Sequence, residues 1–271
     1  MPELPEVERV RRMLDPAMTG ARFERVRLNR ADLRQPFPAG FARHLRKQHV
    51  RALTRRGKYL LAELESGATL IMHLGMSGWF YVEPGRRQGG RRHDHVVFTM
   101  SSGMTVTFND PRRFGVMDLV AAGRMAEHPS LGRMGPEPLS RAFDARALAR
   151  GLAGRRVALK VALLDQRVVA GIGNIYASDA LHLARLSPFR LASTLADRSG
   201  APRAGCDRLV AAIKAVLRRA IALKDDGAYR ASRFRVYERD GEPCTNRGCR
   251  GTIARAEQAG RSTFYCPVCQ R

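Results

Sequence analysis

Three residues at the start of the chain could do covalent chemistry together: Pro2, Glu3 and Glu6. Methionine aminopeptidase normally removes an initiator methionine that precedes a small residue, which would leave Pro2 with a free secondary amine. An α-amino group titrates near pH ~8, against ~10.4 for lysine, so a useful fraction is unprotonated at neutral pH. Such an amine attacks an aldehyde-like carbon to form an imine, and the carboxylates beside it are candidate proton carriers. Proline and glutamate are also ordinary start signals of a helix, and these residues alone favour that structural interpretation.

The cysteines near the end of the chain form the strongest motif. Four residues separate Cys244 from Cys249, sixteen follow, and two separate Cys266 from Cys269. This spacing is typical of two knuckles that hold one tetrahedral Zn²⁺ through four thiolates. No ligand position is left for a substrate, so we expect a structural zinc that supplies much of the folding free energy of this segment. Cys206 stands apart and is expected to be a buried thiol.

The first half of the chain reads as a helix followed by short strands. After Pro5, the apolar residues Val7, Val10 and Leu14 follow helical spacing, and proline is tolerated in a first helical turn. Alternating apolar and polar residues predict strands over residues 23–28, 59–64, 69–74, 95–100 and 104–108. Many short strands favour an antiparallel sandwich. The Gly/Arg-rich stretch 85–92 reads as a surface loop.

The second half reads as helical, after prolines and glycines that indicate a linker over residues 129–141. We expect helices over residues 144–153, 157–164, 175–185 and 203–223. Before the third of these, Gly171-Ile172-Gly173-Asn174 forms a tight turn whose free N–H groups could bind one phosphate. Turns of this kind more often only connect two helices.

The charge of the chain narrows the class of partner. Lys+Arg number 48 against 25 Asp+Glu, for a formal net charge of +23 over 271 residues. A folded protein this basic usually meets a polyanion, with nucleic acid the first candidate and an anionic membrane surface the second. We find no long basic amphipathic helix, no apolar run near the ~20 residues of a transmembrane helix and no signal peptide. These features favour a cytosolic, nucleic-acid-binding protein.

Several motifs together resemble the family of formamidopyrimidine-DNA glycosylase and endonuclease VIII, in order and over nearly the whole chain. They are Pro2-Glu3-Leu4-Pro5-Glu6-Val7-Glu8, Arg56-Gly57-Lys58-Tyr59, His73-Leu74-Gly75-Met76-Ser77-Gly78, Asn109-Asp110-Pro111-Arg112-Arg113-Phe114-Gly115, Gly171-Ile172-Gly173-Asn174-Ile175-Tyr176-Ala177 and Gly260-Arg261-Ser262-Thr263-Phe264-Tyr265-Cys266. The resemblance implies an α+β multidomain protein. Its parts would be an N-terminal antiparallel β-sandwich with an N-terminal helix over residues 1–128, the linker, a helix–two-turn–helix domain over 142–235 and a zinc finger over 236–271.

The resemblance also implies a bifunctional DNA glycosylase/AP lyase of base excision repair, acting as a monomer on double-stranded DNA. Pro2 would attack C1′ of the damaged nucleotide, and Glu3 would protonate the ring oxygen of the sugar or the leaving base. Glu6 would support that site, and Lys58 would contact a phosphate and assist strand cleavage. Elimination of the 3′ and then the 5′ phosphate would follow, with no cofactor besides zinc. Without the resemblance, Lys58 reads as a solvated lysine at a strand end.

A base inside a duplex must be flipped out before this chemistry, and something must fill the gap it leaves. The resemblance implies that Met76, Arg112 and Phe114 insert there, although the first and last otherwise read as sandwich core. Asn174 and Arg261 would grip the flanking phosphates. The matching segments also make His73 and Tyr237 expected DNA-contacting residues.

The chain departs from the family pattern in two segments. The first zinc knuckle holds four residues where the family usually has two. The segment 223–232 is short and charged, where enzymes that close over 8-oxoguanine have a longer segment rich in glycine and threonine. We therefore expect formamidopyrimidines, oxidised pyrimidines or hydantoins to be removed as well as 8-oxoguanine or better.

Three other interpretations remain at this point. The lesion preference could be that of endonuclease VIII, for oxidised pyrimidines. The scaffold could be a non-catalytic binder of damaged DNA, although Pro2, Glu3 and Lys58 together argue against it. Charge alone is also compatible with an RNA-binding zinc-ribbon protein.

Overall fold

The computed structural model describes residues 2–85, 90–223 and 234–271. Contacts divide the chain into two compact units, Met1–Arg133 and Met134–Arg271, which are described separately below. The first opens with helix α1 (Leu4–Met18), which has Pro5 in its first turn. Its apolar residues recur at helical spacing, and Val7, Val10 and Leu14 are fully buried. The helix expected after Pro5 is therefore confirmed.

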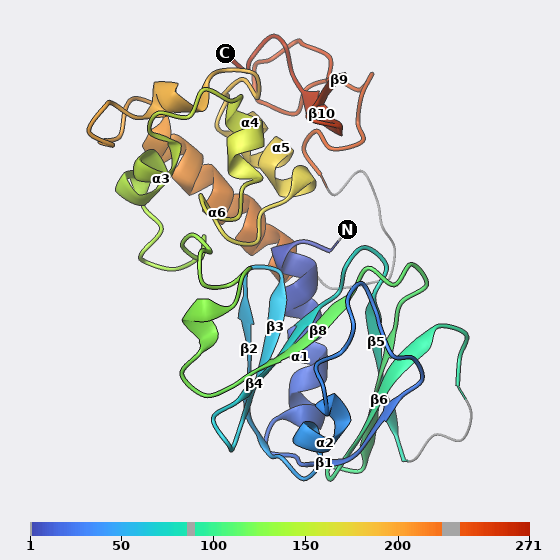
Figure 1. The fold of residues 1–271 in the computed structure, drawn as a ribbon. Helices are drawn as coiled ribbons and strands as arrows, with labels where there is room; N and C mark the ends of the chain where they lie inside the picture. The colour runs from blue at the N-terminus through green and yellow to red at the C-terminus, as the bar shows by residue number, and fades with distance from the viewer. Residues whose placement is uncertain (1, 86–89, 224–233) are drawn as a thin grey trace. The chain divides into compact units, whose positions relative to one another are not determined.

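Eight strands of the first unit form two antiparallel four-stranded sheets (Figure 1). One sheet has the order β1 (Phe23–Leu28), β6 (Asp94–Met100), β7 (Met104–Asn109) and β5 (Trp79–Pro84). The other has the order β2 (Val50–Arg56), β3 (Tyr59–Leu64), β4 (Thr69–His73) and β8 (Val116–Val120). A short helix, α2 (Phe41–Leu45), contacts β1, and a 3-10 turn, η1 (Met125–Glu127), follows β8.

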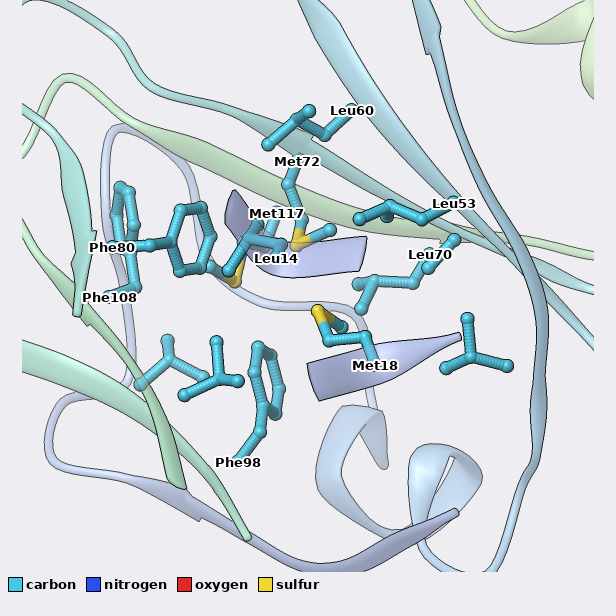
Figure 2. Packing of buried hydrophobic residues seen from close by; sticks show 14 of the residues in the cluster. Leu14, Met18, Leu53, Leu60, Leu70, Met72, Phe80, Phe98, Phe108 and Met117 are labelled. Atoms are coloured by element: carbon cyan, nitrogen blue, oxygen red, sulfur yellow. The ribbon is translucent and has the colours of Figure 1, made fainter. Parts of the chain in front are cut away.

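The core of this unit joins the sheets through α1, which contacts strands of both. Figure 2 shows Leu14 and Met18 of α1 between a group of phenylalanines from one sheet and a group of leucines from the other. All of these side chains are almost fully buried. Burial of apolar surface on this scale is the main force that holds the sheets and the helix together.

In its described residues, 134–223 and 234–271, the second unit is built on four helices and a hairpin. Its helices are α3 (Ala145–Leu152), α4 (Leu159–Leu163), α5 (Asn174–Leu183) and α6 (Cys206–Ala222), with a 3-10 turn η2 (Ala192–Leu195), and its strands are β9 (Ala254–Gln258) and β10 (Arg261–Tyr265). Asp144 caps α3 as expected, because its carboxylate accepts the backbone N–H of Ala147 at 2.7 Å. Cys206 is the fully buried thiol that was predicted.

The expected fold class is confirmed: a helix and an antiparallel sandwich, a helical domain and a four-cysteine finger. The 85–92 loop and the 223–232 segment fall largely on residues 86–89 and 224–233, outside the described residues. Within the described ranges, no helix combines the length and apolar character needed to cross a membrane.

Candidate active site and nucleic-acid interface

The start of α1 holds the three residues that suggested covalent chemistry. Pro2 is half-buried and Glu3 is only 2 % exposed. The Glu6 carboxylate accepts the backbone N–H of Glu3 at 2.9 Å and also accepts a hydrogen bond from Arg9 at 3.2 Å. A glutamate that bonds back to the residue before a helix fixes the chain's entry into that helix. Glu6 therefore holds the backbone that carries Glu3 and Pro2.

Lys58 lies in the turn between β2 and β3 and is buried, which excludes the solvated-lysine reading. Glu8 of α1 pairs with Arg55 at 3.4 Å, and Arg55 donates to the Gly57 carbonyl at 2.8 Å. Burial tends to raise the pKa of Glu8, but hydrogen bonds and charge from Arg11 and other arginines lower it overall. This ion pair links the helix that carries Pro2 to the turn that carries Lys58.

His73, at the end of β4, is held as a neutral imidazole. Its Nδ1 accepts the backbone N–H of Gly75 at 3.1 Å, and its ring centroid lies 4.6 Å from that of Tyr59. Burial, followed by the positive charges of Lys58 and Arg34, lowers the pKa of His73 to about 4. With Nδ1 used as an acceptor, Nε2 carries the proton and can donate to an anion.

Met76, Arg112 and Phe114 project from two loops of the first unit. Met76 is 42 % exposed and Phe114 38 %, so neither belongs to the sandwich core. The Arg112 guanidinium lies 4.8 Å from the centroid of the Phe114 ring, a cation–π contact. Gly75 lets the loops approach, since a Cβ there would lie 2.3 Å from the Phe114 carbonyl carbon and its φ is +67°. The structure thus brings the three expected inserting residues to the surface as one group.

A fully buried carboxylate, Asp110, ties these two loops together. It accepts the Ser77 hydroxyl at 2.6 Å and the Gly115 backbone N–H at 2.7 Å. The Ser77 oxygen accepts in turn the backbone N–H of Arg112 at 3.1 Å. Bonds to an ionised group are stronger than neutral ones, so Asp110 is the anchor from which the exposed side chains are presented.

In the second unit, Asn174 is hydrogen-bonded to one main-chain oxygen of the hairpin formed by β9 and β10, called the zinc hairpin below. The carbonyl of Ser262 accepts Asn174 Nδ2 at 3.0 Å and Lys160 Nζ at 2.9 Å, and the lysine also donates to Thr263 Oγ1 at 2.7 Å. Lys160 is 1 % exposed. Arg261, the neighbour of Ser262, is exposed. The two residues expected to bind phosphates are therefore brought together here.

The tip of that hairpin has a defined turn. Ala259 and Gly260 both have positive φ, 48° and 70°, and they join two paired residues of β9 and β10. Two central residues of positive φ are typical of the two-residue turn that suits the twist of a hairpin. Arg261 follows the turn directly, and Arg255 donates to the Ser262 hydroxyl at 3.0 Å. Guanidinium groups are thus displayed at and near the tip.

The four cysteines converge as the spacing predicted. All four Sγ atoms lie within 4.8 Å of one another, with Cys244 and Cys269 at 3.7 Å and Cys249 and Cys266 at 3.6 Å. Zn–S bonds of about 2.3 Å place the sulfurs of a tetrahedral site about 3.8 Å apart. Gly251 is required beside them, since a Cβ there would lie 2.7 Å from Cys266 Sγ. The residues present fit one structural zinc.

Tyr237 belongs to the small core of the finger. Its ring lies 5.1 Å from that of Phe264 and 5.7 Å from that of Phe234. Asp179 of α5 holds the segment that leads into this core. Its buried carboxylate accepts the backbone N–H groups of Arg235 at 2.8 Å and Val236 at 3.0 Å. Burial raises the pKa of Asp179 above the ordinary value of an aspartate, against the opposing effect of these bonds.

Inspection of the sequence missed Ser77, Asp110, Lys160 and Asp179, all of which position the residues above. For Lys160 and Asp179 a signal existed, because each is a charged residue on the apolar face of an expected helix. Buried charges are rare without a partner. Ser77 and Asp110 both lie in motifs that carry the family resemblance, but nothing in the sequence shows that these two distant residues bond to each other.

Three family models match consecutive parts of this chain. The formamidopyrimidine-DNA glycosylase N-terminal domain matches residues 1–117, the H2TH domain of the same enzyme matches 134–232, and the zinc finger found in FPG and IleRS matches 241–271. Among curated proteins, formamidopyrimidine-DNA glycosylase of Rhodopseudomonas palustris (strain BisB18) is 53 % identical over 293 residues, and that of Azorhizobium caulinodans is 53 % identical over 294. In both cases the match covers 100 % of each chain.

Solved structures give the same similarity. The MutM (FPG) protein from Thermus thermophilus is 39 % identical, with a TM-score of 0.82 over 99 % of this chain and 98 % of that one. A complex of Lactococcus lactis Fpg with DNA that contains an abasic site is 29 % identical, with a TM-score of 0.86 over 99 % of both chains.

Proposed function

This chain belongs to the formamidopyrimidine-DNA glycosylase family, and we propose that Pro2 is the nucleophile with which it removes oxidised bases from duplex DNA. The chain is a base excision repair DNA glycosylase with AP lyase activity. The observation that carries the proposal for Pro2 is its place directly before a helix whose first residues hold two carboxylates in a fixed arrangement.

The proposed reaction begins when the unprotonated amine of Pro2 attacks C1′ of the damaged nucleotide. Glu3 donates a proton to the sugar ring oxygen or the departing base, and the bond between C1′ and the base breaks. The attacking nitrogen then loses its proton, and the bond between C1′ and O4′ breaks as O4′ takes up a proton, so the sugar ring opens. Because the amine is secondary, the product is an iminium ion that carries its positive charge without a further proton. That charge acidifies the C2′ proton, whose loss expels the 3′ phosphate, and a second elimination expels the 5′ phosphate.

Other residues of the chain support this chemistry in the proposal. Glu6 holds Glu3 through its backbone, and Lys58 contacts a phosphate and assists the eliminations. His73 offers the N–H of a neutral ring to the DNA. Met76, Arg112 and Phe114 fill the gap left by the flipped base, where an exposed thioether, guanidinium and ring suit an unstacked pair.

We propose that Asn174 and Arg261 bind the phosphates that flank the flipped nucleotide, with Tyr237 beside them. The observation that supports this is the hydrogen bond from Asn174 to the carbonyl of Ser262, the residue next to Arg261. Zinc, when bound by the four cysteines, supplies the folding free energy that keeps this hairpin formed. The affinity for DNA should then fall steeply with salt.

The covalent step is tested by borohydride trapping on a duplex with an abasic site. We expect wild-type protein to give a covalent adduct, and Pro2→Gly to give much less and to lose base release along with it. Arg12→Gln, a change at an exposed position of the same helix, is the matched control. Unchanged turnover by Pro2→Gly would place the nucleophile elsewhere, and the absence of any adduct from wild-type protein would favour a non-catalytic binder.

The choice of lesion is a separate proposal: formamidopyrimidines and 8-oxoguanine, with oxidised pyrimidines as the alternative. The names of the curated relatives support the first class, and one solved complex of Lactococcus lactis Fpg contains DNA with an oxidised pyrimidine. Single-turnover excision from a panel of duplexes, each with one lesion, decides between them. Faster excision of oxidised pyrimidines than of formamidopyrimidines would establish the alternative.

We further propose that the protein works as a monomer in the cytoplasm, on the chromosome. The bacterial origin of the curated relatives supports this location. Light scattering of the purified protein and imaging of a fluorescent C-terminal fusion test the two statements.

A further inference from the structure

The two zinc knuckles differ in length, and the longer one contains a buried polar residue. Cys244 and Cys249 enclose four residues, whereas Cys266 and Cys269 enclose two. Of the four, only Asn246 is buried, at 8 % exposure. A buried amide must find partners for both of its ends, so its contacts indicate why the loop folds inward.

The side chain of Asn246 reaches three separate parts of the second unit. Its Nδ2 donates to the His182 carbonyl at 3.0 Å and to Cys269 Sγ, in the other knuckle, at 3.2 Å. Its Oδ1 accepts from Arg235 Nη2 at 2.8 Å. These three contacts each pair a donor with an acceptor, which orients the amide, and Nδ2 also lies 3.2 Å from His182 Nε2.

The imidazole of His182 contacts a second cysteine sulfur, that of Cys244. Arg235 Nε donates to its Nδ1 at 3.3 Å, so Nε2 carries the proton and donates to Cys244 Sγ at 3.1 Å. Thiolates from both knuckles therefore receive a hydrogen bond, one from Asn246 and one from a residue of α5. Hydrogen bonds of this kind orient metal ligands and tune the metal site.

Helix α5 touches the finger at both of its ends. Asn174, at its start, holds the hairpin through the Ser262 carbonyl, and His182, near its end, receives Asn246. The second knuckle is attached separately, because Gln270 Nε2 donates to the Leu186 carbonyl at 2.9 Å. Asn246 is thus the side chain of the first knuckle that reaches α5, beside the contacts that His182 makes with Cys244 Sγ and that Arg185 makes with the Arg247 carbonyl at 3.1 Å.

We propose that Asn246 is a positioning residue that fastens the first knuckle to α5 and thereby holds Arg261 beside Asn174 for phosphate binding. The extra length of the knuckle is what allows its side chain to reach the His182 carbonyl and the opposite thiolate together. The part that concerns DNA rests on the proposed roles of Arg261 and Asn174, whereas the part that concerns the zinc ligands does not.

Two substitutions of Asn246 distinguish a role in hydrogen bonding from a role in packing alone. Asn246→Asp keeps the shape but turns an oxygen, instead of an N–H donor, toward the His182 carbonyl and the Cys269 sulfur. Asn246→Ala removes the contacts without adding repulsion. Thr245→Ala, at an exposed position of the same knuckle, is the matched control. The first readout is the rate at which a chromophoric chelator removes zinc from the zinc-loaded full chain.

We expect Asn246→Asp to weaken zinc retention by about 10- to 100-fold, the range seen when hydrogen bonds to metal ligands are lost. Asn246→Ala should have a smaller effect, and Thr245→Ala should match the wild type. If alanine is worse than aspartate, the side chain only fills space and the proposal is wrong. If both variants retain zinc like the wild type, the proposal is also wrong.

The second readout is affinity for an abasic-analogue duplex at fixed salt, measured in a double-mutant cycle with Arg261→Ala. Asn246→Ala should weaken binding several-fold in the wild-type background and much less when Arg261 is already absent. Fully additive losses would refute the positioning of Arg261. If Arg261→Ala alone leaves affinity unchanged, the proposed phosphate role of Arg261 fails, while zinc retention still decides the attachment of the knuckle.

Discussion

Replacing Asp110 by alanine should lower the stability of the first unit, and it should lower the rate of base excision by more than the loss of stability explains. The change removes the acceptor of two hydrogen bonds, at 2.6 Å from Ser77 and 2.7 Å from the Gly115 N–H, in a fully buried place. Hydrogen bonds to a charged group contribute about 1.5–3 kcal/mol each, so we expect a loss of about 3–6 kcal/mol in the free energy of unfolding. Domains are stable by only about 5–15 kcal/mol, so the loss is large.

Asp110→Asn should cost much less. A flipped amide can still accept the Gly115 N–H through its oxygen, while the Ser77 hydroxyl turns to accept from the amide nitrogen. Urea unfolding gives the stability, and single-turnover excision at a temperature where all variants are folded gives the activity. Asp32→Ala, which removes an exposed carboxylate, serves as the control.

We expect excision by Asp110→Ala to fall further than stability explains, because the loops that carry Met76, Arg112 and Phe114 lose their common anchor. Excision by Asp110→Asn should be only mildly slower. A variant Asp110→Ala that unfolds at the same urea concentration as the wild type, or that is folded and excises at the wild-type rate, would refute the reasoning.

Three further predictions concern other parts of the chain. His73 has a pKa of about 4 in the folded protein, against an ordinary value of 6.5, so the unfolded chain binds more protons between these pH values. The free energy of unfolding should therefore fall by up to about 3 kcal/mol as the pH decreases through this window. The urea midpoint of His73→Gln should lack this pH dependence. Cys266→Ser should lose zinc, by atomic absorption, and affinity for duplex DNA, whereas Cys206→Ser should keep both; tight binding by zinc-free Cys266→Ser would contradict the role of the finger. Glu8→Gln should destabilise the first unit by about 1–3 kcal/mol and slow strand cleavage, while Arg12→Gln does neither; equal cleavage rates would show that the ion pair with Arg55 is not needed.

The elements that the sequence predicts well are those with an uninterrupted local pattern. Strand β3 has the predicted bounds, because burial alternates along it, and β1 has them although its pairing with β6 shifts register between Phe23 and Arg25. Strand β2 was missed, because a bulge after Val50 breaks its alternation and arginines make up three of its seven residues. Strand β8 is a half-exposed edge strand, and its residues lack a clear buried face.

Helix ends were less predictable, because distant residues compete for the backbone. A helix was expected from Val157, but α4 begins at Leu159. Ala158 instead pairs with Leu191, and the Val157 carbonyl accepts the N–H of Ala192 at 2.9 Å. No local pattern announces such a pairing over more than thirty positions, which is why the start was placed too early.

The candidate site shows the same division. The exposed tips, Met76, Arg112 and Phe114, were identified by motif, and their exposure agrees with the inserting role that is proposed for them. The residues that hold them were not identified, because Ser77 and Asp110 meet only after the sandwich has formed. Tertiary hydrogen bonds between loops leave no periodic trace in a sequence, in contrast to the even spacing of a helix or strand.

The attachment of the zinc hairpin has a consequence for protein engineering. Asn174 and Lys160 both hold the carbonyl of Ser262, an atom that every amino acid supplies. These two hydrogen bonds therefore do not depend on which side chains β10 displays, whereas the further bond from Lys160 needs the hydroxyl of Thr263. Arginines of β10 can be added, removed or replaced by acidic residues to change the affinity for undamaged DNA, while the two hydrogen bonds to the Ser262 carbonyl are kept.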